Sequence, residues 1–179
     1  MEIYNPSEDS FLLSSVLEKE IPKLLKKNKN LKFLEIGTGS GIQLKTAVKS
    51  GIKKQNIFSC DVNQKSVEHC KDIGFNSVVS DLFENIKGKY SIIIFNPPYL
   101  PLDSREPKDS RISTTGGEKG SEILNRFLKQ AKKHLAKDGK IFILISSLTK
   151  GTDFKGFRKK TLAKQKLFFE ELRVLELIL

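Results

Sequence analysis

Short apolar runs alternate with helical patterns along this chain. Five runs have the length and composition of strands, and they cover residues 31–36, 56–61, 77–80, 91–95 and 140–146. Apolar residues at helical spacing cover residues 10–25, 42–49, 63–73 and 122–135. The tail from about residue 164 predicts two more strands around Glu170 and Glu171. Strands that alternate with helices predict an α/β fold, in which helices cover both faces of a parallel sheet.

Proline and glycine mark several element boundaries. Pro22 lies inside the first helical pattern, where we expect it to break or restart the helix because proline lacks an N–H group. Gly74 is expected to end the third helix, and Asp138-Gly139 to turn the chain into the fifth strand. Residues 100–121 form the one long irregular stretch, and a loop of that length is usually functional or mobile.

Length and composition indicate one soluble domain. The 179 residues are 38% hydrophobic and 30% charged, so we expect a single domain over residues 1–179 with a short helical entrance before the first strand. The formal net charge of +11 suits binding to nucleic acid or to an acidic partner. A lysine-rich solvated surface explains the same charge equally well.

Some function classes are not indicated. Cys60 and Cys70 form no CxxC pattern, and His69 and His134 stand apart, so no metal site is predicted. The start, MEIYNPSEDS, is polar and acidic, unlike a signal peptide. No apolar run approaches the roughly 20 residues of a membrane span. These features favour a reduced, cytoplasmic protein.

A glycine-rich turn follows the first predicted strand, in the sequence EIGTGSG. Gly37, Gly39 and Gly41 allow a tight turn and a close approach of the backbone to a ligand. The spacing G-x-G-x-G differs from the dinucleotide pattern G-x-G-x-x-G. Glu35 would repel a diphosphate and attract a cationic group. A purely structural turn is the alternative.

Two further carboxylates follow the next two strands. Asp61 is placed where a carboxylate can bind both hydroxyls of a ribose, and Asp81 where it can accept from an adenine amine. Helix capping is the alternative role for both. Together with Glu35, they suit a ligand that has ribose, adenine and a positive charge but no phosphate. The sequence therefore predicts S-adenosylmethionine as cofactor.

The fourth predicted strand ends in Asn96-Pro97-Pro98-Tyr99. The prolines make the turn stiff, and the carbonyl groups of Asn96 and Pro97 can each accept an N–H from a planar amine. The Tyr99 ring can hold the plane of that substrate. We therefore expect catalysis of methyl transfer by positioning, with Asn96, Pro97 and Tyr99 as catalytic residues. A plain turn is the alternative.

These motifs resemble those of class I methyltransferases that act on planar amines. Two segments narrow the resemblance to the HemK-type glutamine-N5 methyltransferases of the eukaryotic and archaeal branch: YNPSEDSFLL resembles their Y-x-P-x-E-D-[ST]-F-L-L entrance, and TTGGEKGSEILNRFL their A-G-G-x-x-G segment. The resemblance implies a Rossmann-like class I fold with a mostly parallel, seven-stranded sheet. It also implies methyl transfer from S-adenosylmethionine to the glutamine of the GGQ motif in a class I translation release factor.

The same resemblance assigns roles to single residues. In chain order these are Ser10 at the cofactor entrance, Glu35 and Gly37 beside the methionine part, Asp61 on the ribose, Asp81 and Leu82 on the adenine, and Asn96 between cofactor and substrate. Bacterial relatives carry an extra N-terminal helical domain that grips the release factor, whereas here the first predicted strand begins at Leu31. Residues 147–163 are short and basic, so the mode of substrate docking stays open.

The sequence leaves other methyl acceptors open, and the resemblance implies a partner subunit. A nucleic-acid methyltransferase acting on an exocyclic amine of adenine or guanine is the alternative, because the target amine is planar there too. A lysine acceptor and a non-catalytic cofactor-binding subunit are also open. By resemblance, we expect a small zinc-binding activator subunit to pair with the edge of the third strand, where Val78 and Val79 lie.

Overall fold

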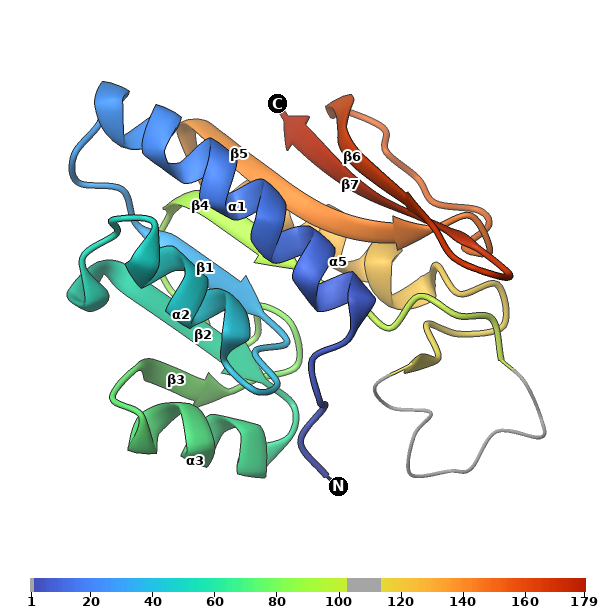
Figure 1. The fold of residues 1–179 in the computed structure, drawn as a ribbon, viewed down its shortest axis with the longest axis horizontal. Helices are drawn as coiled ribbons and strands as arrows, with labels where there is room; N and C mark the ends of the chain where they lie inside the picture. The colour runs from blue at the N-terminus through green and yellow to red at the C-terminus, as the bar shows by residue number, and fades with distance from the viewer. Residues whose placement is uncertain (1, 103–113) are drawn as a thin grey trace.

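The chain folds around one seven-stranded sheet in the computed structural model, which describes residues 2–102 and 114–179 (Figure 1). The strand order is β3-β2-β1-β4-β5-β7-β6, and β7 is antiparallel to both of its neighbours. The other neighbouring strands are parallel, which confirms the mostly parallel sheet. The strands are β1 Phe33–Ile36, β2 Ile57–Asp61, β3 Asn76–Val79, β4 Tyr90–Phe95, β5 Leu135–Ser146, β6 Arg158–Lys166 and β7 Glu171–Ile178.

Helices lie on both faces of this sheet (Figure 1). The helices are α1 Glu8–Lys27, α2 Ile42–Lys49, α3 Gln64–Asp72 and α5 Glu122–His134, with a 3-10 turn over Lys54–Asn56. Successive strand residues face opposite layers: Phe33, Ile92 and Ile94 pack with α1 and α2, whereas Leu34 and Ile93 pack with α5. Both layers are apolar, so the central strands read as continuous hydrophobic runs, as parallel strands do.

Helix α1 runs through Pro22 without a break, so the expected interruption is wrong. Proline at this position removes the hydrogen bond to the Glu18 carbonyl, four residues earlier. Both Pro22 and Glu18 are exposed, so water can bind the carbonyl that loses its partner. Leu13, Leu17 and Ile21 on the opposite side are completely buried, and their packing holds the helix together.

Two strands begin several residues earlier than the sequence predicts. Strand β5 starts at Leu135, and the expected turn at Asp138-Gly139 lies inside it, as an irregularity where Asp138 has a φ of 58°. Strand β6 starts at Arg158 rather than near Lys164, because its exposed lysines hide the alternation that marks a strand. Hydrogen bonds to β7 hold these residues in a strand, although their own composition does not indicate one.

The irregular stretch after the NPPY turn has its two described ends side by side. The Leu100 N–H donates to Thr114 at 2.9 Å, and the Gly116 N–H donates back to Leu100 at 2.9 Å. The prediction for residues 103–113 lies outside the described residues. None of the helices in the described part of the chain combines the length and apolar character of a membrane span.

Candidate active site

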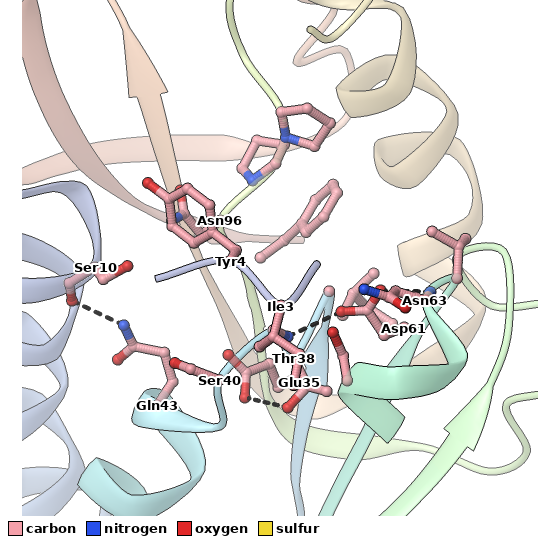
Figure 2. Close-up of a pocket in the computed structure, with 18 of the residues that line it drawn as sticks. Ile3, Tyr4, Ser10, Glu35, Thr38, Ser40, Gln43, Asp61, Asn63 and Asn96 are labelled. Carbon is pink, nitrogen blue, oxygen red and sulfur yellow. Dashed lines mark hydrogen bonds between the residues drawn. The ribbon is translucent and has the colours of Figure 1, made fainter. Parts of the chain in front are cut away.

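A pocket of about 760 Å³ opens at the carboxyl ends of β1, β2 and β4 (Figure 2). Strand β1 lies between β2 and β4, so the segments that follow these three strands meet at one edge of the sheet. This is the place where open α/β sheets bind their ligands. The volume lies in the range of small-molecule sites.

The glycine-rich turn is joined to the end of β2. The N–H groups of Gly37 and Thr38 both donate to the Cys60 carbonyl, at 2.8 and 3.0 Å. The Gly39 N–H donates to one Asp61 carboxylate oxygen at 2.9 Å, and the Asn63 N–H donates to the other at 2.8 Å. A carboxylate has more lone pairs than these donors use, so Asp61 can still accept from a ligand. Asn63, and not Asp61, is the residue that caps α3.

Glu35 is a carboxyl group inside the protein. Only 3% of the residue is exposed, and the Thr38 hydroxyl donates to it at 3.2 Å (Figure 2). Burial raises its pKa well above the usual range, the Thr38 hydrogen bond lowers it, and the nearby Asp61 adds to the rise. Burial also raises the pKa of Asp61, against the N–H donors that lower it. Among the described residues, neither Glu35 nor Asp61 forms an ion pair with a basic side chain; their donors are the Thr38 hydroxyl and backbone N–H groups.

Asp81, the third carboxylate, has one of its two oxygens in an ion pair. Arg126 of α5 donates through Nη2 to one Asp81 oxygen at 2.8 Å, and both side chains are partly exposed. This pairing leaves the second Asp81 oxygen for a ligand. Leu82 follows with a φ of 50°, which is uncommon for a residue with a branched side chain, and its carbonyl accepts from the Ser80 hydroxyl at 3.0 Å.

Helix α1 brings Ser10 to the pocket through one buried glutamine. Gln43 of α2 donates through Nε2 to the Ser10 carbonyl at 2.8 Å, and its Oε1 accepts from the Ser14 hydroxyl at 2.9 Å (Figure 2). Only 2% of Gln43 is exposed. The amide therefore fixes the start of α1 beside the glycine-rich turn.

Asn96 has one half of its amide bound and the other half free. Its Nδ2 donates to Asp9 at 2.9 Å, and the Tyr4 hydroxyl donates to the same carboxylate at 3.0 Å. Asn96 Oδ1 is buried and has no hydrogen-bond partner among the described residues. Turning the amide over would place Oδ1 against the Asp9 carboxylate, so the acceptor is held facing away from it. A buried acceptor without a partner is costly to the fold, and it indicates a ligand with a donor.

The A-G-G-x-x-G-like segment lies directly on the NPPY turn. A Cβ atom on Gly116 would lie 2.5 Å from the Pro98 carbonyl oxygen, and one on Gly120 would meet the Tyr99 carbonyl oxygen. Only glycine allows this approach of two backbones. The Thr149 hydroxyl donates to the same Tyr99 carbonyl at 2.9 Å. The turn that carries Asn96 is thus held from two sides.

Most of the residues singled out from the sequence line this pocket. They are Ser10, Glu35, Gly37, Gly39, Asp61, Asp81, Leu82, Asn96 and Pro97. Gly41 lies outside the lining and begins α2 with a φ of 73°. Tyr99 also lies outside it, and its partly buried ring packs on the α1 side of the core. Burial raises the pKa of Tyr99, and Asp9 and Glu170 add to the rise, so its hydroxyl stays neutral.

Sequence reasoning missed several residues of the site. They are Tyr4, Asp9, Gln43, Asn63 and Arg126. Tyr4, Asp9 and Arg126 occur inside the two segments that carried the family resemblance, so a signal was present for them. Gln43 and Asn63 gave none, because a polar residue at the start of a helix is common everywhere.

The pocket is acidic although the chain is basic. Its described lining holds the carboxyl groups of Glu2, Asp9, Glu35, Asp61 and Asp81 and one basic group, Arg126. Phosphate would be repelled here, and a ligand with ammonium or sulfonium charge would be stabilised. The donor set therefore fits S-adenosylmethionine. Among the described residues, no three His, Cys, Asp or Glu side chains are grouped to hold a metal ion.

Comparison with known proteins agrees with this geometry. Residues 11–170 match the model of the methyltransferase small domain. The chain belongs to that methyltransferase family. This methyltransferase is also 40% identical to a Methanocaldococcus jannaschii protein whose name gives it provisionally as a protein N5-glutamine methyltransferase. The comparison covers 97% of this chain and 90% of the other. The match places the chain with the HemK-type enzymes of the eukaryotic and archaeal branch.

Two further comparisons extend the likeness. The methyltransferase is 30% identical to the eRF1 methyltransferase catalytic subunit of Schizosaccharomyces pombe, over 80% of its own length and 72% of the other's. Its fold resembles that of a Thermus thermophilus 16S rRNA N2 G1207 methyltransferase solved with AdoMet and guanosine, with a TM-score of 0.63. That comparison covers 96% of this chain and 43% of the other at 17% identity, and it shows the class I methyltransferase fold alone.

Replacing Glu35 by glutamine should change the stability of the fold and the affinity for the cofactor in opposite directions. The folded-state pKa is raised, so Glu35 stabilises the fold at low pH and this contribution is lost as pH rises through that pKa. At neutral pH, Glu35→Gln should raise the melting temperature by a few degrees and weaken S-adenosylmethionine binding measured by calorimetry. Asp81→Asn is the control, since its partly exposed, paired carboxylate should give no such gain. A less stable Glu35→Gln protein would contradict this account.

Replacing Gly116 by alanine should displace the NPPY turn. Its Cβ would clash with the Pro98 carbonyl, so methyl transfer should fall at least about tenfold, as expected when catalytic groups are misplaced. Gly88→Ala is the control, because Gly88 has a φ of 86° but open space around it. It should lose some stability and keep its turnover. Equal turnover in the two variants would show that the contact does not matter.

Proposed function

We propose that this methyltransferase transfers a methyl group from S-adenosylmethionine to the side-chain amide nitrogen of the glutamine in the GGQ motif of a class I release factor. The observation that carries the proposal is Asn96 Oδ1, a buried acceptor beside the acidic pocket that has no hydrogen-bond partner in the described part of the chain. Two relatives add support, because their names give glutamine and eRF1 as targets.

The cofactor side of the pocket follows from its carboxylates. Asp61 would accept from the ribose hydroxyls, with its orientation already fixed by the Gly39 and Asn63 N–H groups. The free oxygen of Asp81 would accept from the adenine amine. Glu35 would face the cationic methionine part, next to Gly37 and Ser10. The bound cofactor supplies a methyl group on a positively charged sulfur.

The acceptor side follows from the NPPY turn. Asn96 Oδ1 and the Pro97 carbonyl would each accept one N–H of the glutamine amide, which holds the nitrogen in place for an in-line displacement. The nitrogen–carbon bond would form as the carbon–sulfur bond breaks, S-adenosylhomocysteine would leave, and the amide nitrogen would release one proton to water. The hydrogen bond from Asn96 to Asp9 polarises the Asn96 amide and increases the negative charge on Oδ1. That charge stabilises the positive charge that develops on the acceptor nitrogen. Tyr99 would act through the stiffness of the turn, because its ring packs into the core.

Mass spectrometry of a release factor incubated with the enzyme and cofactor tests this function. We expect one added methyl on the glutamine of the Gly-Gly-Gln motif, and a loss of orders of magnitude in Asn96→Ala, whose positioning acceptor is removed. Calorimetry with the cofactor checks that the variant still folds. Separate reactions with tRNA and DNA serve as alternative acceptors. Methylation of nucleic acid with none of the factor would overturn the glutamine assignment.

We further propose that a small zinc-binding activator subunit pairs with the edge of β3. Strand β3 is the last strand on its side of the sheet, so one row of its backbone groups faces no other strand of the described sheet. Val78 and Val79 on it are 41% and 44% exposed. An apolar edge of this kind supports strand addition by a partner.

Val78→Lys should break that complex without changing the fold. Lysine at an exposed edge position disfavours pairing with another strand. Val48→Lys is a matched control, because Val48 is 40% exposed but lies on α2. Co-purification of the tagged enzyme with the subunit should be lost in the first variant and kept in the second. A wild-type chain that is monomeric, soluble and fully active alone would refute the requirement for a partner.

A further inference from the structure

The turn between β6 and β7 exposes two neighbouring phenylalanines. Phe168 is 92% and Phe169 84% exposed, more than any other large apolar side chain of the described residues. Their rings meet edge to face, with centroids 4.6 Å apart and an angle of 83° between the planes. Burial of this much aromatic surface would be favourable, so its display on a hairpin tip calls for a partner.

The tip is braced by the segment that also supports the NPPY turn. The Leu167 N–H donates to the Glu170 carbonyl at 2.8 Å and closes the hairpin. Glu170 accepts from the Ser146 hydroxyl, and the Glu171 N–H donates to Ser147 at 2.9 Å. Two residues further on, the Thr149 hydroxyl binds the Tyr99 carbonyl. The hairpin tip and the NPPY turn therefore lie at the same end of the sheet, where the parallel strands have their carboxyl ends (Figure 1).

Basic side chains run along β6 up to the tip. They are Arg158, Lys159, Lys160, Lys164 and Lys166, and all five residues are exposed. Of these five residues, Lys164 alone has an ion-pair partner within the described chain, and that partner is Glu171 at 4.0 Å. Lysines on an edge strand also prevent aggregation, but two exposed phenylalanines at its end would work against that purpose. The combination suits an apolar hollow that has acidic residues beside it.

We propose that the β6–β7 hairpin, with Phe168 and Phe169 at its tip, is the docking surface for the folded protein that presents the acceptor side chain. The inference rests on the proposed function. The pocket holds the cofactor and one side chain, so the rest of a folded acceptor must contact the rim of the pocket. The partner surface is apolar where it meets the two rings and acidic where it faces β6.

Ring geometry favours a protein over nucleic acid as the occupant. Single-stranded nucleic acid binds aromatic side chains by stacking successive bases on flat ring faces, beside a basic groove. Here the two ring planes stand at 83° to each other, so they offer no pair of parallel faces for successive bases and instead form a compact apolar knob. Such a knob fits the apolar pockets that aromatic anchors fill in protein interfaces.

Steady-state kinetics with the intact release factor test the apolar part. The double variant Phe168→Ser/Phe169→Ser should raise KM for the factor about tenfold or more, as loss of an interface anchor does. Its kcat and its affinity for S-adenosylmethionine should not change, which also shows that it is folded. Leu179→Ser is the control, since Leu179 is 56% exposed at the opposite end of β7 and should leave KM unchanged.

A pair of charge reversals tests the basic part. Lys164→Glu/Lys166→Glu should raise KM, and more strongly at low salt than at high salt, because exposed charges are screened. Lys26→Glu/Lys27→Glu makes the same change in net charge at the end of α1 and should have little effect. An equal rise in both variants would show a response to net charge alone and would overturn the assignment of β6.

The outcomes distinguish the two levels of the proposal. A wild-type enzyme that methylates no release factor overturns the proposed function, whatever the hairpin variants do. A wild-type enzyme that methylates the factor, with unchanged KM in the phenylalanine variant, overturns the docking surface alone. Unchanged KM together with weaker binding to ribosomal RNA, or with dissociation of a dimer, assigns the tip to another occupant and also overturns it.

Discussion

A carboxyl group carried into the protein interior is the constraint around which this structure is arranged. Glu35 lies in β1, the strand in which every residue is buried, and only 3% of this residue is exposed. An ionised group there is costly unless a cation meets it. The glycine-rich turn gives a ligand access to that position, and the Thr38 hydroxyl gives the carboxyl group its one described hydrogen bond. One side chain thus belongs both to the centre of the sheet and to the lining of the pocket.

Asn96 shows a similar arrangement with a neutral group. Asp9 accepts from Asn96 Nδ2 and also from the Tyr4 hydroxyl, whereas Asn96 Oδ1 has no hydrogen-bond partner among the described residues. A substrate that supplies the missing donor recovers the cost of desolvating that oxygen. Stiff prolines and contacting glycines keep the oxygen in place, because a mobile turn would relax toward water or toward another donor.

The sequence indicated the parts of the site that depend on strand ends. Parallel strands bring their carboxyl ends together, so the order of residues along the chain is enough to group Glu35, Asp61 and Asn96. The pairing of Asp81 with Arg126 and the inward packing of Tyr99 could not be predicted in this way, because both depend on how α5 and α1 pack on the sheet. The early start of β6 was hidden for a related reason: its order comes from β7, not from its own residues.

The close contact between glycines and the NPPY turn has a consequence for variation in this protein. Leu100 and Thr114 are hydrogen-bonded at the two ends of the intervening segment, and Gly116 lies on Pro98. The two described ends of the segment therefore lie side by side. Lengthening such a connection costs little free energy of loop closure, since that cost grows only slowly with length. Residues between these ends can therefore change in number and composition while Asn96 stays where it is.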